Sequence, residues 1–172
     1  MTMYQNLAER RAKFVTVFCD ASHCPNTLAT GWAVWMKLGS PPETKRLSGA
    51  LPGVKDSQNA EIIALEEALA HLETRLDLKD QIVVIESDCL GAIDAIRDRA
   101  LRLTALGAKY VKLKWVKGHQ GVKCARSAVN TWCDSEAKRN MRALRDAIIK
   151  RSGNANRNTH PRKLRDDHRC YP

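Results

Sequence analysis

The sequence contains no long apolar run. No window reaches the ~18 consecutive apolar residues of a membrane-spanning helix. The first residues, which include Glu9, Arg10 and Arg11, lack the apolar core of a secretory signal. We therefore expect a cytoplasmic protein that makes no contact with a membrane.

The cysteines include no CxxC pair. Six are present, at Cys19, Cys24, Cys89, Cys124, Cys133 and Cys170, and two of them lie within the apolar periodicity of expected elements. Structural zinc sites commonly contain CxxC pairs, and cysteines within an apolar periodicity are typical of core residues, so the pattern argues against a zinc site and against a disulfide framework.

Acidic residues are scarce in the second half of the chain. Between Arg97 and Arg126, nine lysines and arginines accompany a single acid, Asp98, and from Arg145 onward eight accompany three acids. The net charge of +10 is therefore concentrated there, which favours a polyanionic partner such as nucleic acid. A basic face that is merely solvated is the alternative.

The length of 172 residues, with 44% hydrophobic and 28% charged residues, fits one compact domain. We place this domain at residues 13–150, after an N-terminal extension (1–12) that could form a short amphipathic helix. A basic, flexible tail (151–172) is expected to follow. Strand patterns cover residues 14–20, 30–37, 44–51, 81–87 and 110–116. Helical patterns cover residues 57 to 71 or 75, 89–97, 100–106 and 127–150.

The order of these elements predicts an α/β fold. Three consecutive strands with short connections form an antiparallel meander. Right-handed crossovers then place the fourth and fifth strands parallel to the first. The expected architecture is a mixed five-stranded sheet, in the order 3-2-1-4-5, flanked by helices.

Two acids follow apolar strands. Asp20 ends the run Phe14–Cys19 before the turn-forming residues from Ser22 onward, and Asp88 ends the run 81–87. An ionised carboxylate in an apolar interior is costly unless a metal, a cation or water compensates it. The alternatives are that Asp20 caps a loop and that Asp88 caps the following helix.

Two further acids lie on apolar helical stripes. Glu61 precedes Ala64, Leu65, Ala68, Leu69 and Leu72 at helical spacing, and Asp134 lies along the side of Cys133, Ala137, Met141, Leu144 and Ile148. Glu61 alone could be a first-turn acid that the helix dipole favours. Four inward acids that converge, however, would need cations, and oxygen ligands suit Mg²⁺ or Mn²⁺. A pair of such ions is a common device for phosphodiester displacement, so with the basic surface the sequence predicts a nuclease.

Six short motifs in a fixed order carry a resemblance to a known family. They are Phe18-Cys19-Asp20-Ala21-Ser22, Gly31-Trp32-Ala33-Val34, Asn59-Ala60-Glu61-Ile62-Ile63-Ala64-Leu65, Glu86-Ser87-Asp88, Trp115-Val116-Lys117-Gly118-His119 and Asn130-Thr131-Trp132-Cys133-Asp134-Ser135-Glu136-Ala137. Together they resemble type 1 ribonuclease H over residues 13 to about 145.

The resemblance implies an endonuclease that cuts the RNA strand of RNA/DNA hybrids and leaves 5′-phosphate and 3′-hydroxyl ends. By position, Asp20, Glu61, Asp88 and Asp134 match the family's ligands for two Mg²⁺ or Mn²⁺ ions, and His119 matches its mobile-loop histidine. For His119, a solvated loop residue is the alternative. A same-fold nuclease that acts on DNA, like a junction resolvase, and a silent hybrid-binding module are the alternative functions.

The chain departs from the family pattern where the substrate would lie. His23 to Leu28 replace the usual glycine-rich turn, and Gln58 stands where many members have asparagine. The stretch between Asp88 and His119 is too short for the basic protrusion of some members. We expect Ser22, Gln58 and Asn59 to contact the RNA sugars. We expect the hybrid to be bound by Lys117, by Lys138 and Arg142 on the last helix, and by the basic tail. We also expect the enzyme to be a monomer.

Overall fold

The computed structural model describes residues 13–39, 43–117 and 125–158. Its elements are β1 (Lys13–Cys24), β2 (Ala29–Leu38), β3 (Glu43–Leu51), α2 (Ser57–Arg75), β4 (Gln81–Ser87), α3 (Leu90–Leu101), a 3-10 helix (Arg102–Thr104), β5 (Tyr110–Trp115) and α4 (Ala125–Asn158). The sheet has the order β3-β2-β1-β4-β5. Its first three strands are antiparallel, and β4 and β5 run parallel to β1, which confirms the predicted topology.

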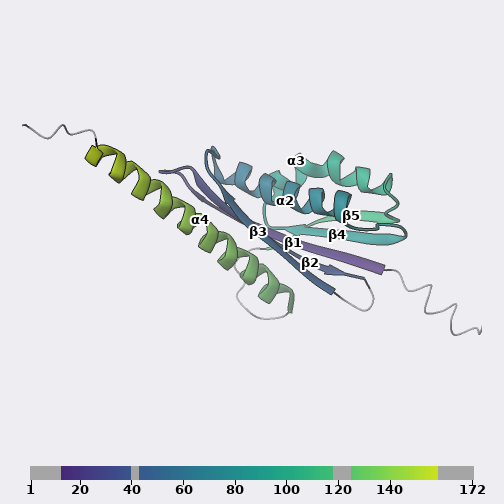
Figure 1. Ribbon diagram of the computed structural model, residues 1–172. Helices are drawn as coiled ribbons and strands as arrows, with labels where there is room; N and C mark the ends of the chain where they lie inside the picture. The colour runs from purple at the N-terminus through teal and green to yellow at the C-terminus, as the bar shows by residue number, and fades with distance from the viewer. Residues whose placement is uncertain (1–12, 40–42, 118–124, 159–172) are drawn as a thin grey trace, which may run out of the picture.

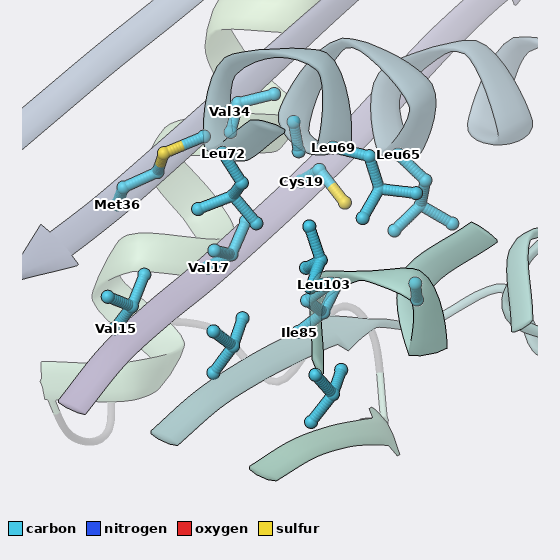
Figure 2. Close-up of a cluster of buried hydrophobic side chains, with 14 of the residues drawn as sticks. Val15, Val17, Cys19, Val34, Met36, Leu65, Leu69, Leu72, Ile85 and Leu103 are labelled. Atoms are coloured by element: carbon cyan, nitrogen blue, oxygen red, sulfur yellow. The ribbon is translucent and has the colours of Figure 1, made fainter. Parts of the chain in front are cut away.

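Helices cover both faces of the sheet. Figure 1 shows α2 and α3 on one side and α4 crossing the other, with its C-terminal end reaching past the strands. Side chains alternate along β1, so Val15, Val17 and Cys19 join the core under α2, whereas Phe18 packs against α4. Figure 2 shows the first of these cores, in which leucines of α2 meet the strands. The central strand is therefore buried on both faces, as its composition predicts.

The helix α2 begins where the sequence signals it. Asp56 is its N-cap, and the Asp56 carboxylate accepts a hydrogen bond from the Asn59 backbone N–H at 2.8 Å. The stripe that follows Glu61 is buried, and its members are Ala64, Leu65, Ala68, Leu69 and Leu72. This burial fixes the rotation of α2, and with it the direction of Glu61.

The first strand is longer than its sequence pattern indicates. We expected it to end at Asp20, but β1 continues to Cys24 because β2 still pairs with it there, in the register Cys24 to Ala29. Pairing with β2 provides hydrogen-bond partners for backbone groups of the residues after Asp20, which the sequence pattern had assigned to a turn. Asp20 therefore lies within a strand, not in a loop.

The helices also depart from the expected bounds. The separate helix expected at residues 100–106 is wrong: α3 runs on to Leu101 and tightens into the 3-10 turn, with Ala100 fully buried. The helix α4 was expected to end near Lys150 but reaches Asn158. Residues 151–158 contain no proline, and Gly153 costs only about 1 kcal/mol relative to alanine in a helix.

Three of the predicted segments contain residues that the structure does not describe. The N-terminal helix of residues 1–12, residues 118–121 of the loop predicted at 117–121, and the tail beyond residue 158 lie outside the described residues. Within the described part of the chain, none of the helices has the length and apolar character needed to cross a membrane. The described cysteines, Cys19, Cys24, Cys89 and Cys133, are free thiols.

The contact between β2 and α4 depends on Gly31. A Cβ atom at Gly31 would lie 2.1 Å from the Ala137 carbonyl oxygen and 2.4 Å from the Met141 nitrogen. Both atoms belong to the backbone of α4 and cannot rotate away. The missing side chain thus lets α4 lie directly on the sheet, which sets the height of Asp134 above β1.

We expect Gly31→Ala to lower the free energy of unfolding by about 1–3 kcal/mol, the usual cost of overpacking. Urea denaturation followed by circular dichroism measures it. Gly91→Ala is the matched control, because the Cβ atom there meets only the mobile Gln58 side chain, at 3.0 Å, and alanine favours a helix. Equal stability of the two variants would contradict the close approach at Gly31.

Candidate active site

Asp20 lies where β1 and β4 separate. The parallel pairing of the two strands ends at Phe18 with Glu86, whereas β1 continues along β2. Asp20 shares the α4 side of the sheet with Phe18 and is 6% exposed. A gap beyond the carboxyl end of a strand, beside the point where the strand order reverses, is where open α/β sheets bind ligands.

Asp88 and Glu61 approach Asp20 from two other elements. Asp88 directly follows β4, and the N-cap of α3 is Cys89, so the Asp88 carboxylate does not cap that helix. Glu61 comes from the N-terminal part of α2. One carboxylate oxygen from each of the three acids lies within 4.8 Å of the other two. The predicted convergence is confirmed for these three.

A single backbone group serves two of the carboxylates. The Ala21 N–H donates to Asp20 Oδ1 at 2.8 Å and to Glu61 Oε1 at 3.3 Å. The second oxygen, Glu61 Oε2, is buried without a hydrogen-bond partner among the described residues. A buried acceptor left unsatisfied costs roughly 1–3 kcal/mol. The unpartnered carboxylate oxygen and the neighbouring negative charges therefore favour a bound cation.

The protonation of the cluster follows from its burial. Burial, and then the charges of Asp88 and Asp134, raise the pKa of Asp20 to about 7. Burial, and then the charges of Asp20 and Asp88, raise the pKa of Glu61 to about 9. Without cations the site therefore holds protons at neutral pH, because that many negative charges cannot share so small a volume.

Asp134 borders this cluster but has another partner. It lies on α4 with 23% of its side chain exposed, close enough for its charge to raise the pKa of Asp20. The Lys138 ammonium, one turn along the helix, lies 2.7 Å from Asp134 Oδ1 and 2.8 Å from Oδ2. The structure therefore gathers three of the four predicted acids, with the fourth held by Lys138, a residue predicted to bind substrate.

The other expected substrate contacts lie around the cluster. Ser22 is half-buried on β1, opposite Gly31 of β2. Gln58 and Asn59 are exposed in the first turn of α2, where the Asn59 amide donates to Asp56 Oδ2 at 2.8 Å. These three residues lie on the elements that carry Asp20 and Glu61.

The remaining predicted residues are more distant or not described. Lys117 follows β5 and Arg142 lies two turns beyond Asp134, and both side chains are exposed. His119 lies outside the described residues, so its predicted role stays a prediction.

The sequence interpretation missed two residues beside the site. Glu86, on β4, is fully buried, and its Oε1 lies 3.1 Å from Arg126 Nη2 and 3.9 Å from Lys114 Nζ. The Trp115 indole N–H donates to the Asp88 carbonyl oxygen at 2.9 Å, which ties β5 to the end of β4. An acid inside the apolar run 81–87 is the same anomaly that singled out Asp20, so the sequence did carry a signal for Glu86.

The donor set fits a hard divalent cation. All the candidate ligand atoms are carboxylate oxygens, which Mg²⁺ and Mn²⁺ prefer. Such an ion would provide a partner for the Glu61 oxygen that has no hydrogen bond. Its positive charge would also lower the raised pKa values of Asp20 and Glu61. Asp20, Glu61 and Asp88 could hold an ion as they lie, and Asp134 could join them if Lys138 moved away.

Comparison with known proteins agrees with the geometry. The sequence profile of the family described as RNase H matches residues 12–103, which include β1 to α3 and three of the four acids. A search of curated proteins finds no match to the chain.

Without divalent cations, we expect the free energy of unfolding to fall as the pH rises from about 4 to about 9. The folded-state pKa values of Asp20 and Glu61, about 7 and about 9, lie above the ordinary values of 3.8 and 4.5. The folded protein therefore holds protons that the unfolded chain has released, and loses stability as they leave.

Urea denaturation at pH 5, 7 and 9 with a chelator measures this loss. Asp20→Asn should reduce the slope, and Asp94→Asn, which changes an exposed acid of α3, should not. Added Mg²⁺ should restore stability at pH 9. A stability that is constant or rises over this range would contradict the raised pKa values.

We expect Lys138→Met to strengthen Mn²⁺ binding by up to about fivefold, because a partly exposed ion pair of this kind contributes about 1 kcal/mol and its loss frees Asp134. Isothermal titration calorimetry at low ionic strength measures the dissociation constant. Arg142→Met, one turn further along α4, is the control and should leave it unchanged. If Lys138→Met weakens hybrid binding and leaves Mn²⁺ binding as it is, Lys138 has the substrate role that the sequence predicted.

Proposed function

The chain belongs to the RNase H family, and we propose that it hydrolyses the RNA strand of RNA/DNA hybrids, leaving 5′-phosphate and 3′-hydroxyl ends. One observation carries the proposal: Asp20, Glu61 and Asp88 form a carboxylate cluster at the carboxyl ends of parallel strands, within the matched region. A purely structural role does not account for three mutually repelling acids at this edge.

We further propose that Asp20, Glu61 and Asp88, with Asp134, hold two Mg²⁺ or Mn²⁺ ions. When bound, such ions polarise the scissile phosphate and lower the pKa of the attacking water. The protein's part is to supply deprotonated carboxylates in fixed positions. Glu61, with the higher pKa, is the last of the Asp20–Glu61 pair to release its proton, so activity should rise with pH as the cluster ionises.

Recognition of the hybrid would combine two kinds of contact. Ser22, Gln58 and Asn59 lie on the elements that carry Asp20 and Glu61, and their polar side chains suit ribose 2′-hydroxyl groups. Lys117, which follows β5, and Arg142, two turns beyond Asp134 on α4, are exposed cations and suit phosphates. The same proposal includes a role for His119 in proton transfer or product release and a basic tail that helps to bind the substrate. It also includes a monomeric state and a cytoplasmic location.

We expect the protein to cut a labelled RNA/DNA hybrid in the presence of Mg²⁺ and to leave duplex DNA and duplex RNA intact. Asp88→Asn should lower the rate by more than about 100-fold, because even outer partners of metal ligands cost 10- to 100-fold. The variant should remain folded, since it removes charge repulsion among the acids. Asp94→Asn, an exposed acid paired with Arg97, should keep parental activity.

The three substrates separate the alternatives. Equal cutting of duplex DNA would indicate a DNA nuclease with the same fold. Binding of the hybrid without any cutting, in Mg²⁺ and in Mn²⁺, would indicate a binding module. Parental activity in Asp88→Asn would contradict the assignment of the carboxylate cluster.

A further inference from the structure

The face of the sheet that α4 covers is open at the start of β1. Phe18 is 3% exposed and packs against α4, whereas Phe14, four residues earlier on the same face of β1, is 52% exposed. Among the described elements, α4 packs against β1, β2 and β3, and Figure 1 shows it running away from the first residues of β1. Parallel strands are normally covered on both faces. The uncovered end therefore has the character of a binding surface.

Two aromatic rings and an aliphatic side chain form one row across this surface. Phe14 is in register with Ile82 of β4, and Ile82 is in register with Tyr110 of β5. Residues in register project to the same face, and two strand spacings separate Phe14 from Tyr110 by roughly 10 Å. Tyr110 is 57% exposed. Contiguous exposed apolar side chains of this kind mark interaction sites.

The neighbouring row adds positive charge. It runs across four strands, through Lys37 of β2, Thr16 of β1, Val84 of β4 and Lys112 of β5. Both lysines are exposed, and neither forms an ion pair with another described residue. The paired residues of the two rows include no acid. We call these two rows the open face, and its charge favours an anionic ligand.

The chemistry of the open face favours nucleic acid over a protein partner. Lysine is depleted at the centre of protein interfaces, and a second copy of the chain would bring like charges together. Unpaired bases, in contrast, stack on aromatic side chains while cations bind the phosphates. Sheets with exposed aromatic residues bind two or three unpaired bases in this way. Bases inside a duplex are already stacked on one another, so the ligand is single-stranded.

We propose that the open face binds single-stranded nucleic acid, with bases stacked on Phe14 and Tyr110. The backbone phosphates lie along Lys37 and Lys112. Phe14 precedes Asp20 by six residues, roughly 20 Å along β1, so this site is separate from the carboxylate cluster. The inference goes beyond hydrolysis of the hybrid, because it gives the protein a second nucleic-acid site that needs no metal.

The test measures the fluorescence anisotropy of labelled oligo-dT and oligo-U at low salt, with a chelator so that neither is cut. The parent protein should bind at least one of them, and the pair shows whether DNA or RNA is preferred. Phe14→Ala and Tyr110→Ala should each weaken binding by about five- to hundredfold, the loss of one stacked base. Tyr110→Phe keeps the ring and should keep the affinity. Leu101→Ala, which removes a 48% exposed side chain of α3, is the matched control and should bind as the parent does.

A salt series tests the phosphate contacts. Lys37→Gln and Lys112→Gln should each reduce the salt slope of single-strand binding by about 0.7, the value for one phosphate contact. Lys45→Gln is the control, because the Lys45 ammonium already lies 3.0 Å from Glu43 Oε1. Lys45 is also in register with Met36, whose side chain belongs to the core under α2, so it lies on the other face of the sheet.

The outcomes keep this site apart from the carboxylate cluster. Asp88→Asn should bind single strands as the parent does, and Tyr110→Ala should cut a blunt-ended hybrid at the parental rate. A parent protein that binds neither oligonucleotide overturns the open-face site, whether or not the hybrid is cut. So does parental affinity in both ring-to-alanine variants when circular dichroism shows them folded. Ring variants that convert a dimer to a monomer in analytical ultracentrifugation, at unchanged single-strand affinity, would assign the open face to a second copy and also overturn the proposal.

Discussion

Repulsion among buried carboxylates is the constraint that this domain has to withstand. Asp20, Glu61 and Asp88 come from three different elements, and each would move into water if its backbone were free to follow. They stay together because β1 is paired on both sides and buried on both faces, and because the leucine stripe of α2 is locked into the core. The stability of the sheet is thus what keeps an electrostatically unfavourable cluster in place, ready for cations.

The second face of the sheet brings in the fourth acid by a different means. The helix α4 lies directly on β2 because Gly31 has no side chain, and this contact sets the position of Asp134 relative to Asp20. The pairing of Asp134 with Lys138 neutralises one negative charge at the border of the cluster. The same ion pair competes with any cation for Asp134, so the number of ions bound and the ionic strength should be coupled.

A buried acid also organises the basic side of the site. Glu86 lies within a strand, as Asp20 does, but its compensation comes from two side chains, Lys114 and Arg126, that hold β5 and the start of α4 together. The interior of the sheet thus uses acids in two ways. The cluster of Asp20, Glu61 and Asp88 suits a metal, whereas Glu86 lies between two cations, and neither of its oxygens has a hydrogen-bond partner among the described residues.

The sequence by itself determined the strand order, the N-cap Asp56, the apolar stripe of α2 and the three acids that cluster, because each is signalled by a pattern of period, turn residues or charge. It could not determine the end of β1, because pairing with β2 extends that strand to Cys24. It could not determine the end of α4 either, because no proline marks where that helix stops. Only the tertiary structure showed that Lys138 forms an ion pair with Asp134 and that Glu86 forms one with Arg126. It also showed that the missing side chain of Gly31 lets α4 approach β2 closely. The reason is physical: such contacts join residues far apart in the chain or depend on side-chain geometry, and no periodicity reports the distance between two atoms.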